Sequence, residues 1–277
     1  MKRRTLLLSS SAMAFARMQG EAPSPAASLV DCQLYIGDHP RRDLPQFTSS
    51  SWAALGLKQG WLGHFGAFLR QADHLALNRE LHQRCEALPG AVAAVSLDPT
   101  QKSWPRDFEQ SLPKTKGCKP LLRLCPSLHG YDWQHPGLMQ LLDLCSQSAV
   151  PVQIITKFED ARTQLPQVPL PPLPLKGLQD LCQRLPNLRL MLLNLGATDV
   201  QLSLRGLGRN LWVDSAMIEG AAGLAGLLGH WPSERLCLGS YAPFFYAAAL
   251  PLKLQEAGLR QQTHEAVAHN NARAFLG

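Results

Sequence analysis

The stretch LKGLQDLCQRLPNLRLMLLN, residues 175–194, decides the fold of this chain. In its first half, apolar residues recur at the 3.6-residue period of an amphipathic helix, which we expect over residues 175–184. The Leu-Pro-Asn that follows ends such a helix. The last seven residues form a mostly continuous apolar run, typical of a parallel strand that is buried on both faces. The stretch therefore predicts a helix, a turn and a covered strand.

The same cycle repeats along the chain from residue 29 onward. Apolar runs predict eight strands at residues 29–35, 57–62, 91–97, 120–124, 152–157, 188–194, 211–215 and 235–240. Periodic stretches predict helices that include residues 75–87, 138–148, 175–184, 221–230 and 244–257. Eight strand–helix units in roughly 250 residues predict an α/β fold, a (β/α)8 barrel of the TIM type in a single domain. An open doubly wound sheet is the alternative, although Gly37-Asp38-His39-Pro40 is not its usual phosphate loop.

One proline-rich segment, QLPQVPLPPLP at residues 164–174, interrupts the cycle. Its prolines exclude a helix and a central strand. We expect an extended loop that crosses the top of the barrel after the fifth strand, with a proline-rich docking motif as the alternative.

Residues 1–27 form a leader, and the barrel domain occupies residues 28–277. A basic triplet at residues 2–4 precedes a short, mildly apolar run and an Ala-x-Ala sequence at residues 14–16. The adjacent arginines followed by Thr-Leu-Leu resemble a twin-arginine signal. We therefore expect export to the periplasm or another extracytoplasmic location; a frayed basic N-terminus is the alternative.

Composition excludes several classes of protein. The 277 residues include 27 Lys and Arg against 21 Asp and Glu, and removing the three basic residues of the triplet leaves 24 against 21. That balance, without a dense Lys/Arg run, predicts no nucleic-acid partner. No apolar run is long enough for a membrane span. The sequence is silent on oligomeric state.

The seven cysteines include no C-x-x-C pair, so they predict neither a zinc finger nor a redox motif. Five of them lie in apolar runs and are expected to be small buried hydrophobes, namely Cys32, Cys125, Cys145, Cys182 and Cys237.

In a barrel of this type, function collects at the carboxyl ends of the strands. The predicted substrate-binding residues there are Gln33, Tyr35, Trp61, Arg123, Tyr131, Lys157, Arg162, Glu219, Ser240, Tyr241 and Phe244. Metal-free acid–base chemistry would use His129 with Asp160 or Asp214. The structural alternatives are a histidine satisfied by a neighbouring carbonyl or carboxylate, and an Asp160–Arg162 pair that pins the proline-rich loop.

Five segments of the sequence resemble segments of a known protein family. They are VDCQLYIG at 30–37, LRLCPSLHGY at 122–131, PVQII at 151–155 with EDAR at 159–162, RLCLGSYAP at 235–243 and NNAR at 270–273. In this order they resemble the amidohydrolase-related (amidohydrolase 2) family of the metal-dependent hydrolase superfamily. The resemblance implies a (β/α)8 barrel and, in active members, a hydrolase or decarboxylase that uses one or two divalent metals.

This chain departs from the family where the metal ligands would stand. The first strand of the family carries H-x-H, and Gln33 and Tyr35 stand at those positions. Ile155 stands at the fifth-strand histidine, and Tyr241 at the eighth-strand aspartate. A neutral amide and a phenol of pKa ~10 are poor zinc ligands, and an aliphatic side chain is none. We therefore expect no cofactor and no metal site, zinc being the ion that the family would imply.

Two functions follow. The first is an exported hydrolase or decarboxylase with a degenerate, metal-free site, which acts on a small anionic substrate held by Arg123, Lys157 or Arg162. The second is a catalytically inactive barrel that binds a small molecule or a protein partner. Measuring the bound metal content is the simplest way to distinguish these two functions.

Overall fold

The computed structural model describes residues 29–113, 118–165 and 169–277, so the predicted leader lies outside the described residues. In the described part, eight strands alternate with helices: β1 (Val30–Ile36), β2 (Gln59–His64), β3 (Ala91–Ala93), β4 (Leu122–Leu124), β5 (Val152–Ile155), β6 (Leu190–Leu193), β7 (Leu211–Asp214) and β8 (Leu236–Cys237). Each predicted strand is confirmed, and most are shorter than the apolar run that predicted them.

The eight strands are parallel and follow the order of the chain. Hydrogen-bonded ladders join β1-β2-β3 and, separately, β4-β5-β6-β7-β8. Two isolated parallel bridges connect these groups, Val95 with Leu122 and Leu34 with Ala242. At the second seam, the backbone N–H of Cys32 also donates to the carbonyl of Leu238 at 2.8 Å. The strands therefore close into a ring, and the predicted (β/α)8 barrel is confirmed.

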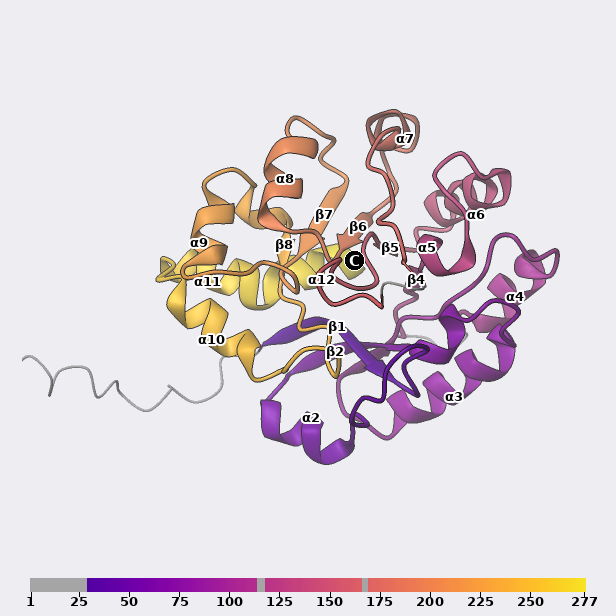
Figure 1. Cartoon of the computed structure of the whole chain (residues 1–277), viewed down its shortest axis with the longest axis horizontal. Helices are drawn as coiled ribbons and strands as arrows, with labels where there is room; N and C mark the ends of the chain where they lie inside the picture. The colour runs from indigo at the N-terminus through magenta and orange to yellow at the C-terminus, as the bar shows by residue number, and fades with distance from the viewer. Residues whose placement is uncertain (1–28, 114–117, 166–168) are drawn as a thin grey trace, which may run out of the picture.

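The helices surround this ring (Figure 1). They are α2 (Ser49–Leu55), α3 (His74–Glu86), α4 (Trp104–Ser111), α5 (Pro126–His129), α6 (Pro136–Gln147), α7 (Leu178–Arg184), α8 (Ala197–Ser203), α9 (Gly223–Leu228), α10 (Ala249–Glu256), α11 (Gln261–Glu265) and α12 (Asn271–Leu276), with single turns η1 (Phe65–Phe68), η2 (Ser233–Arg235) and η3 (Ala266–Asn270). None of the helices in the described ranges is long and apolar enough to cross a membrane.

The helix predicted over residues 244–257 begins later than expected. It starts at Ala249, and residues 243–248 form turns. The N–H of Phe245 donates to the carbonyl of Tyr241 at 3.2 Å, and the ring of Phe244 stacks on Tyr241 with 4.9 Å between centroids. These contacts hold Phe244 over the end of β8, so Phe244 belongs to the barrel mouth and not to a helix.

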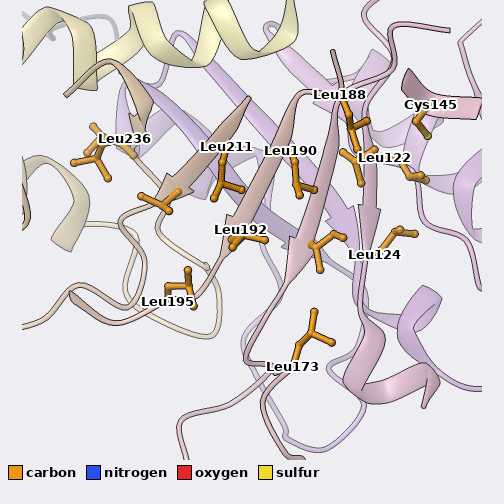
Figure 2. Close-up of a cluster of buried hydrophobic side chains, with 14 of the residues drawn as sticks. Leu122, Leu124, Cys145, Leu173, Leu188, Leu190, Leu192, Leu195, Leu211 and Leu236 are labelled. Atoms are coloured by element: carbon orange, nitrogen blue, oxygen red, sulfur yellow. The ribbon is translucent and has the colours of Figure 1, made fainter. Parts of the chain in front are cut away.

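Apolar side chains pack in two layers. Along β6, Leu190 and Leu192 belong to the layer between the strands and the helices (Figure 2), while Met191 and Leu193 belong to the layer inside the ring. This alternation is the period of two that a strand imposes. The five cysteines expected in the core are buried, and Cys118 is exposed.

The described part of the proline-rich segment runs as an extended loop after β5, as predicted. The N–H of Leu173 donates to the carbonyl of Thr156 at 2.8 Å, just past the end of β5. The Gln164 amide closes the loop, since it donates to the Leu170 carbonyl at 2.9 Å and accepts from the Leu170 N–H at 2.8 Å. Leu170 packs against the inner layer, so this loop covers part of the barrel mouth.

Candidate functional site

The interior of the barrel is crossed by Arg123, whose side chain is fully buried. Its Nε donates to Oε1 of Gln153 at 2.8 Å and its Nη1 to the Leu34 carbonyl at 3.0 Å. Its Nη2 donates to the carbonyls of Cys32 at 2.8 Å and Trp61 at 3.2 Å. The guanidinium therefore ties β1, β2 and β5 together, and these bonds engage all three of its nitrogens without a substrate.

Aromatic side chains fill the mouth above Arg123. The Tyr35 ring stacks on Phe65 with 4.4 Å between centroids and meets the edge of Tyr241 at 5.4 Å. The Tyr241 hydroxyl donates to the Phe158 carbonyl at 2.6 Å. Tyr35, Phe65 and Tyr241 have no exposed surface. We call this cluster the aromatic plug; its members are Tyr35, Phe65, Phe68, Phe158, Tyr241 and Phe244.

The residues at the four expected ligand positions do not fit a zinc ion. The Gln33 amide donates to the Tyr35 hydroxyl at 3.3 Å, and Ile155 packs in the inner layer. Burial raises the pKa of Tyr35 to about 12 and that of Tyr241 well above its ordinary value, so both phenols stay neutral. Zinc needs imidazole, thiolate or carboxylate donors, and the described residues contain no cluster of three such side chains.

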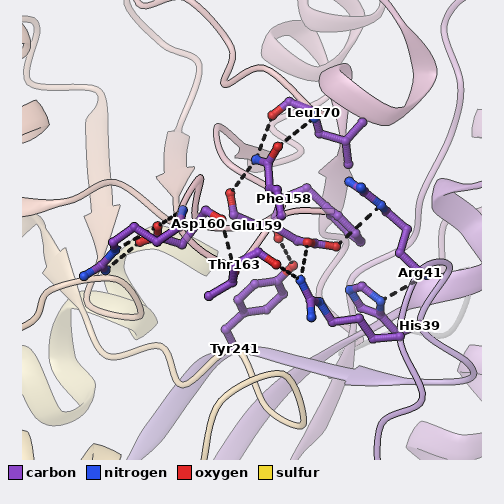
Figure 3. Close-up of polar contacts among 11 residues, drawn as sticks. His39, Arg41, Phe158, Glu159, Asp160, Thr163, Leu170 and Tyr241 are labelled. Carbon is purple, nitrogen blue, oxygen red and sulfur yellow. Dashed lines mark hydrogen bonds and ion pairs between the residues drawn. The ribbon is translucent and has the colours of Figure 1, made fainter. Parts of the chain in front are cut away.

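Two arginines from the loop after β1 meet a buried carboxylate from the loop after β5 (Figure 3). Nη2 of Arg42 donates to Oε2 of Glu159 at 2.8 Å and also to the Thr163 carbonyl. Nε of Arg41 lies 3.7 Å from Oε1 of Glu159, whose side chain has no exposed surface. We call Arg41, Arg42 and Glu159 the arginine cluster. Its two arginines are not among the site residues predicted from the sequence, where their only signal is two adjacent basic residues shortly after the first strand.

The arginine cluster rests on the aromatic plug through His39. The His39 ring stacks on Phe158 with 4.9 Å between centroids and lies 5.4 Å from Phe244. Burial, followed by the charges of Arg42 and Arg41, lowers the pKa of His39 to about 4. His39 is therefore neutral at physiological pH, and the positive charge here comes from the arginines.

Four of the predicted site residues meet at a hollow of about 260 Å³ at the ends of β5, β6 and β7. They are Lys157, Asp160, Arg162 and Glu219. Nη2 of Arg162 lies 2.7 Å from Oδ2 of Asp160 and 2.8 Å from Oε2 of Glu219. Lys157 pairs with Asp199. Both cations of this rim hollow thus already have carboxylate partners, and the hydrogen bonds from Arg162 lower the pKa of Asp160 to about 2.

Asp214 and Ser240 lie at the ends of β7 and β8. Asp214 is fully buried and accepts from the N–H groups of Asn194 at 2.8 Å and Ala216 at 3.3 Å. Burial outweighs these bonds and raises its pKa to about 7. Ser240 and Lys253 line a hollow of about 210 Å³ nearby.

His129 and Tyr131 lie on another side of the mouth. Nε2 of His129 is 3.2 Å from the Ala67 carbonyl, and burial lowers the pKa of His129 to about 4. Tyr131 lines a hollow of about 460 Å³ beside the proline-rich loop. No hydrogen bond or ion pair recorded for the described residues joins any two of His129, Asp160 and Asp214, so the predicted acid–base group is not assembled.

The side chain of Trp61 points away from the barrel mouth, although its carbonyl accepts from Arg123. Its ring stacks on Phe275 of α12 with 5.7 Å between centroids. The carbonyl of Phe275 accepts from Nη1 of Arg189, which directly precedes β6, at 2.8 Å. α12 therefore closes the amino-terminal end of the barrel, and Trp61 faces that end.

Solved structures share this architecture. One is 5-carboxyvanillate decarboxylase from Sphingomonas paucimobilis, with a TM-score of 0.71, 13% identity, and coverage of 91% of this chain and 99% of the other. Another is an amidohydrolase II, with a TM-score of 0.68, 14% identity, and coverage of 90% and 99%. This chain has the barrel fold of the amidohydrolase 2 structures.

A third similar structure extends the comparison. It is 2,6-dihydroxybenzoate decarboxylase from Rhizobium, with a TM-score of 0.63, 10% identity, and coverage of 91% of this chain and 99% of the other. No family model matches the sequence, and no curated protein matches it. The resemblance inferred from the sequence is thus confirmed in the fold, among structures of amidohydrolases and decarboxylases.

Proposed function

We propose that this chain is a metal-free barrel of the amidohydrolase type that binds a small anionic molecule at its mouth and does not perform metal-assisted hydrolysis. The observation that carries the proposal is the aromatic plug. Barrel enzymes hold their reacting groups at the carboxyl ends of the strands, and here Tyr35 and Tyr241 occupy that place, fully buried against Phe65 and Phe158.

Charge at the mouth supports an anionic ligand. The arginine cluster has two guanidinium groups against one carboxylate, which leaves it net positive. The rim hollow, by contrast, has Lys157 and Arg162 against three carboxylates, those of Asp160, Asp199 and Glu219. Among the described residues, the arginine cluster thus has an excess of positive charge that the rim hollow lacks.

The test is metal content together with ligand binding. We expect the purified mature chain to contain zinc, manganese and iron well below one equivalent, and its melting temperature to rise with small carboxylates more than with matched amides. Gln33→Ala serves as the control for metal retention. One equivalent of metal in the wild type would overturn the proposal, and its loss in Gln33→Ala would assign that metal to the first-strand position.

A second candidate function, a metal-free hydrolase or decarboxylase, is favoured by Asp214. A general acid or base works best with a pKa near the working pH, and burial raises the pKa of this carboxyl to about 7. The hollow lined by Ser240 and Lys253 lies at the end of the adjacent strand. Turnover of ester, amide or carboxylate substrates that disappears in Asp214→Asn would favour this function, whereas turnover that persists would exclude Asp214.

Export is a further part of the proposal and rests on the sequence of residues 1–27. Cell fractionation of the full chain beside a variant with Arg3→Lys and Arg4→Lys tests it. We expect the wild type in the periplasm and the double variant in the cytoplasm; equal distributions would count against a twin-arginine signal.

A further inference from the structure

We infer that Arg41 and Arg42 form a carboxylate-binding site whose anion position is taken by the chain's own Glu159. This inference rests on the proposed function, because it names the ligand class and the residues of the mouth that would bind it. The ligand would be a small organic carboxylate that displaces the Glu159 side chain.

The first step is the position of Glu159. Its side chain has no exposed surface, although it comes from a loop at the barrel mouth. A buried carboxylate is costly unless it is paired. Its recorded partners come from the loop after β1, and Arg42 is 117 residues away in the chain. Glu159 thus fills the place that an external anion would take between the loops after β1 and β5.

The second step is that Arg42 has an unused hydrogen-bond donor. Glu159 uses Nη2 of Arg42, whereas Nε of Arg42 is buried without a hydrogen-bond partner among the described residues. A free carboxylate is not tethered and can take Nε and Nη2 together in the bidentate geometry that guanidinium groups favour. The Arg42 side chain is 29% exposed, so it is accessible from solvent.

The third step is the surroundings of the charge. The Arg42 guanidinium lies 5.7 Å from the centroid of the Phe244 ring. His39 and Phe158 complete an aromatic wall beside it, and His39 is neutral. Displacement of Glu159 would therefore expose a cationic site with an apolar wall, which suits a carboxylate with an apolar body.

Chemical rescue tests this inference directly. Glu159→Ala removes the CH2–COO⁻ part of the side chain, and acetate has the same two carbons and the same charge. We expect the melting temperature of Glu159→Ala to rise saturably with acetate, by about 3 °C or more at a concentration well above the dissociation constant. Acetamide, and sodium chloride at matched ionic strength, should have a clearly smaller effect.

Matched variants make the test specific. Asp160→Ala removes the neighbouring rim carboxylate and should not be rescued by acetate, and Glu159→Ala combined with Arg42→Gln should lose the rescue. Equal responses to acetate and chloride, or a rescue that survives Arg42→Gln, would overturn the inference. If Glu159→Ala does not fold, acetate titration of Glu159→Gln by calorimetry replaces it. Glu159→Gln should then bind acetate at least tenfold more tightly than the wild type does. Equal affinities in the two proteins would refute the site.

The metal content of the same preparations separates the two proposals. Stoichiometric metal in the wild type overturns the proposed function whatever acetate does. Absence of metal together with absence of rescue overturns the carboxylate site alone.

Discussion

Replacing Arg123 with methionine tests whether this arginine holds the barrel together or serves a substrate. Methionine fills a similar volume with apolar atoms and has no N–H donors. The substitution removes the bonds from the guanidinium to Gln153 and to the carbonyls of Leu34, Cys32 and Trp61. It also leaves these buried acceptors without the donor that Arg123 provided.

The structure sets the size of the effect. A hydrogen bond from a charged group contributes about 1.5–3 kcal/mol, and removing one partner from a buried charged contact costs about 3–5 kcal/mol. Nε2 of Gln153 also donates to the Cys32 carbonyl at 3.0 Å, so we expect this acceptor to keep a partner in the variant. We therefore expect Arg123→Met to lower the free energy of unfolding by about 4 kcal/mol.

Urea unfolding followed by tryptophan fluorescence measures this change. The midpoint should fall while the slope of the transition stays the same, because the surface exposed on unfolding is unchanged. Arg162→Met is the matched control, since Arg162 is an exposed arginine of the rim, and its midpoint should stay close to that of the wild type. A loss below about 1 kcal/mol in Arg123→Met, together with loss of ligand binding, would refute the structural role and restore the substrate-binding prediction.

Three further predictions concern Asp214, the aromatic plug and metal. Burial raises the pKa of Asp214 from 3.8 to about 7, so the folded state holds a proton that the unfolded chain releases; this stabilisation is complete below pH 3.8 and is lost as the pH rises through 7. Histidines with lowered pKa values, such as His39 and His129, gain stability over the same range, so the Asp214 contribution is taken as the difference in unfolding free energy between wild type and Asp214→Asn. Between pH 6.5 and 8 this difference should fall by about 1 kcal/mol; a difference that does not change with pH would contradict the raised pKa. Tyr241→Phe removes the bond to the Phe158 carbonyl and should cost about 1 kcal/mol in urea unfolding; an unchanged midpoint would mean that the bond does not hold the plug. A chelator should leave the melting temperature of the wild type unchanged, and a fall that added zinc reverses would count against the proposed function.

Much of the fold could be predicted from local patterns. Leu190–Leu193 and its seven counterparts were recognised as strands because parallel strands covered on both faces need nearly continuous apolar runs. The helical pattern over residues 244–257 predicts a start that is too early, because the periodicity does not reveal that Phe244 stacks on Tyr241. A contact of that kind depends on the end of β8 and is invisible in the helical pattern.

The candidate site could be predicted less well. Lys157, Asp160, Arg162 and Glu219 do meet at one hollow, because the ends of adjacent parallel strands lie side by side. Arg123 also lies at a predicted strand, but its polar side chain gave no sign that it would point into the closed ring and bind backbone carbonyls. The position of Trp61 could not be predicted either, because its partner Phe275 in α12 is more than 200 residues away in the chain.

By itself, the sequence determined the order and type of the elements and the chemistry available at Gln33, Tyr35, Ile155 and Tyr241. Periodicity and the donor atoms of a side chain are local properties that can be read without coordinates. The tertiary structure decided which side chains meet: that Tyr35 and Tyr241 pack into one plug, and that Glu159 is buried against Arg42. Those contacts arise when the eight strands close into a ring and bring distant loops to one mouth, where burial and charge are set by neighbours that are far apart in the chain.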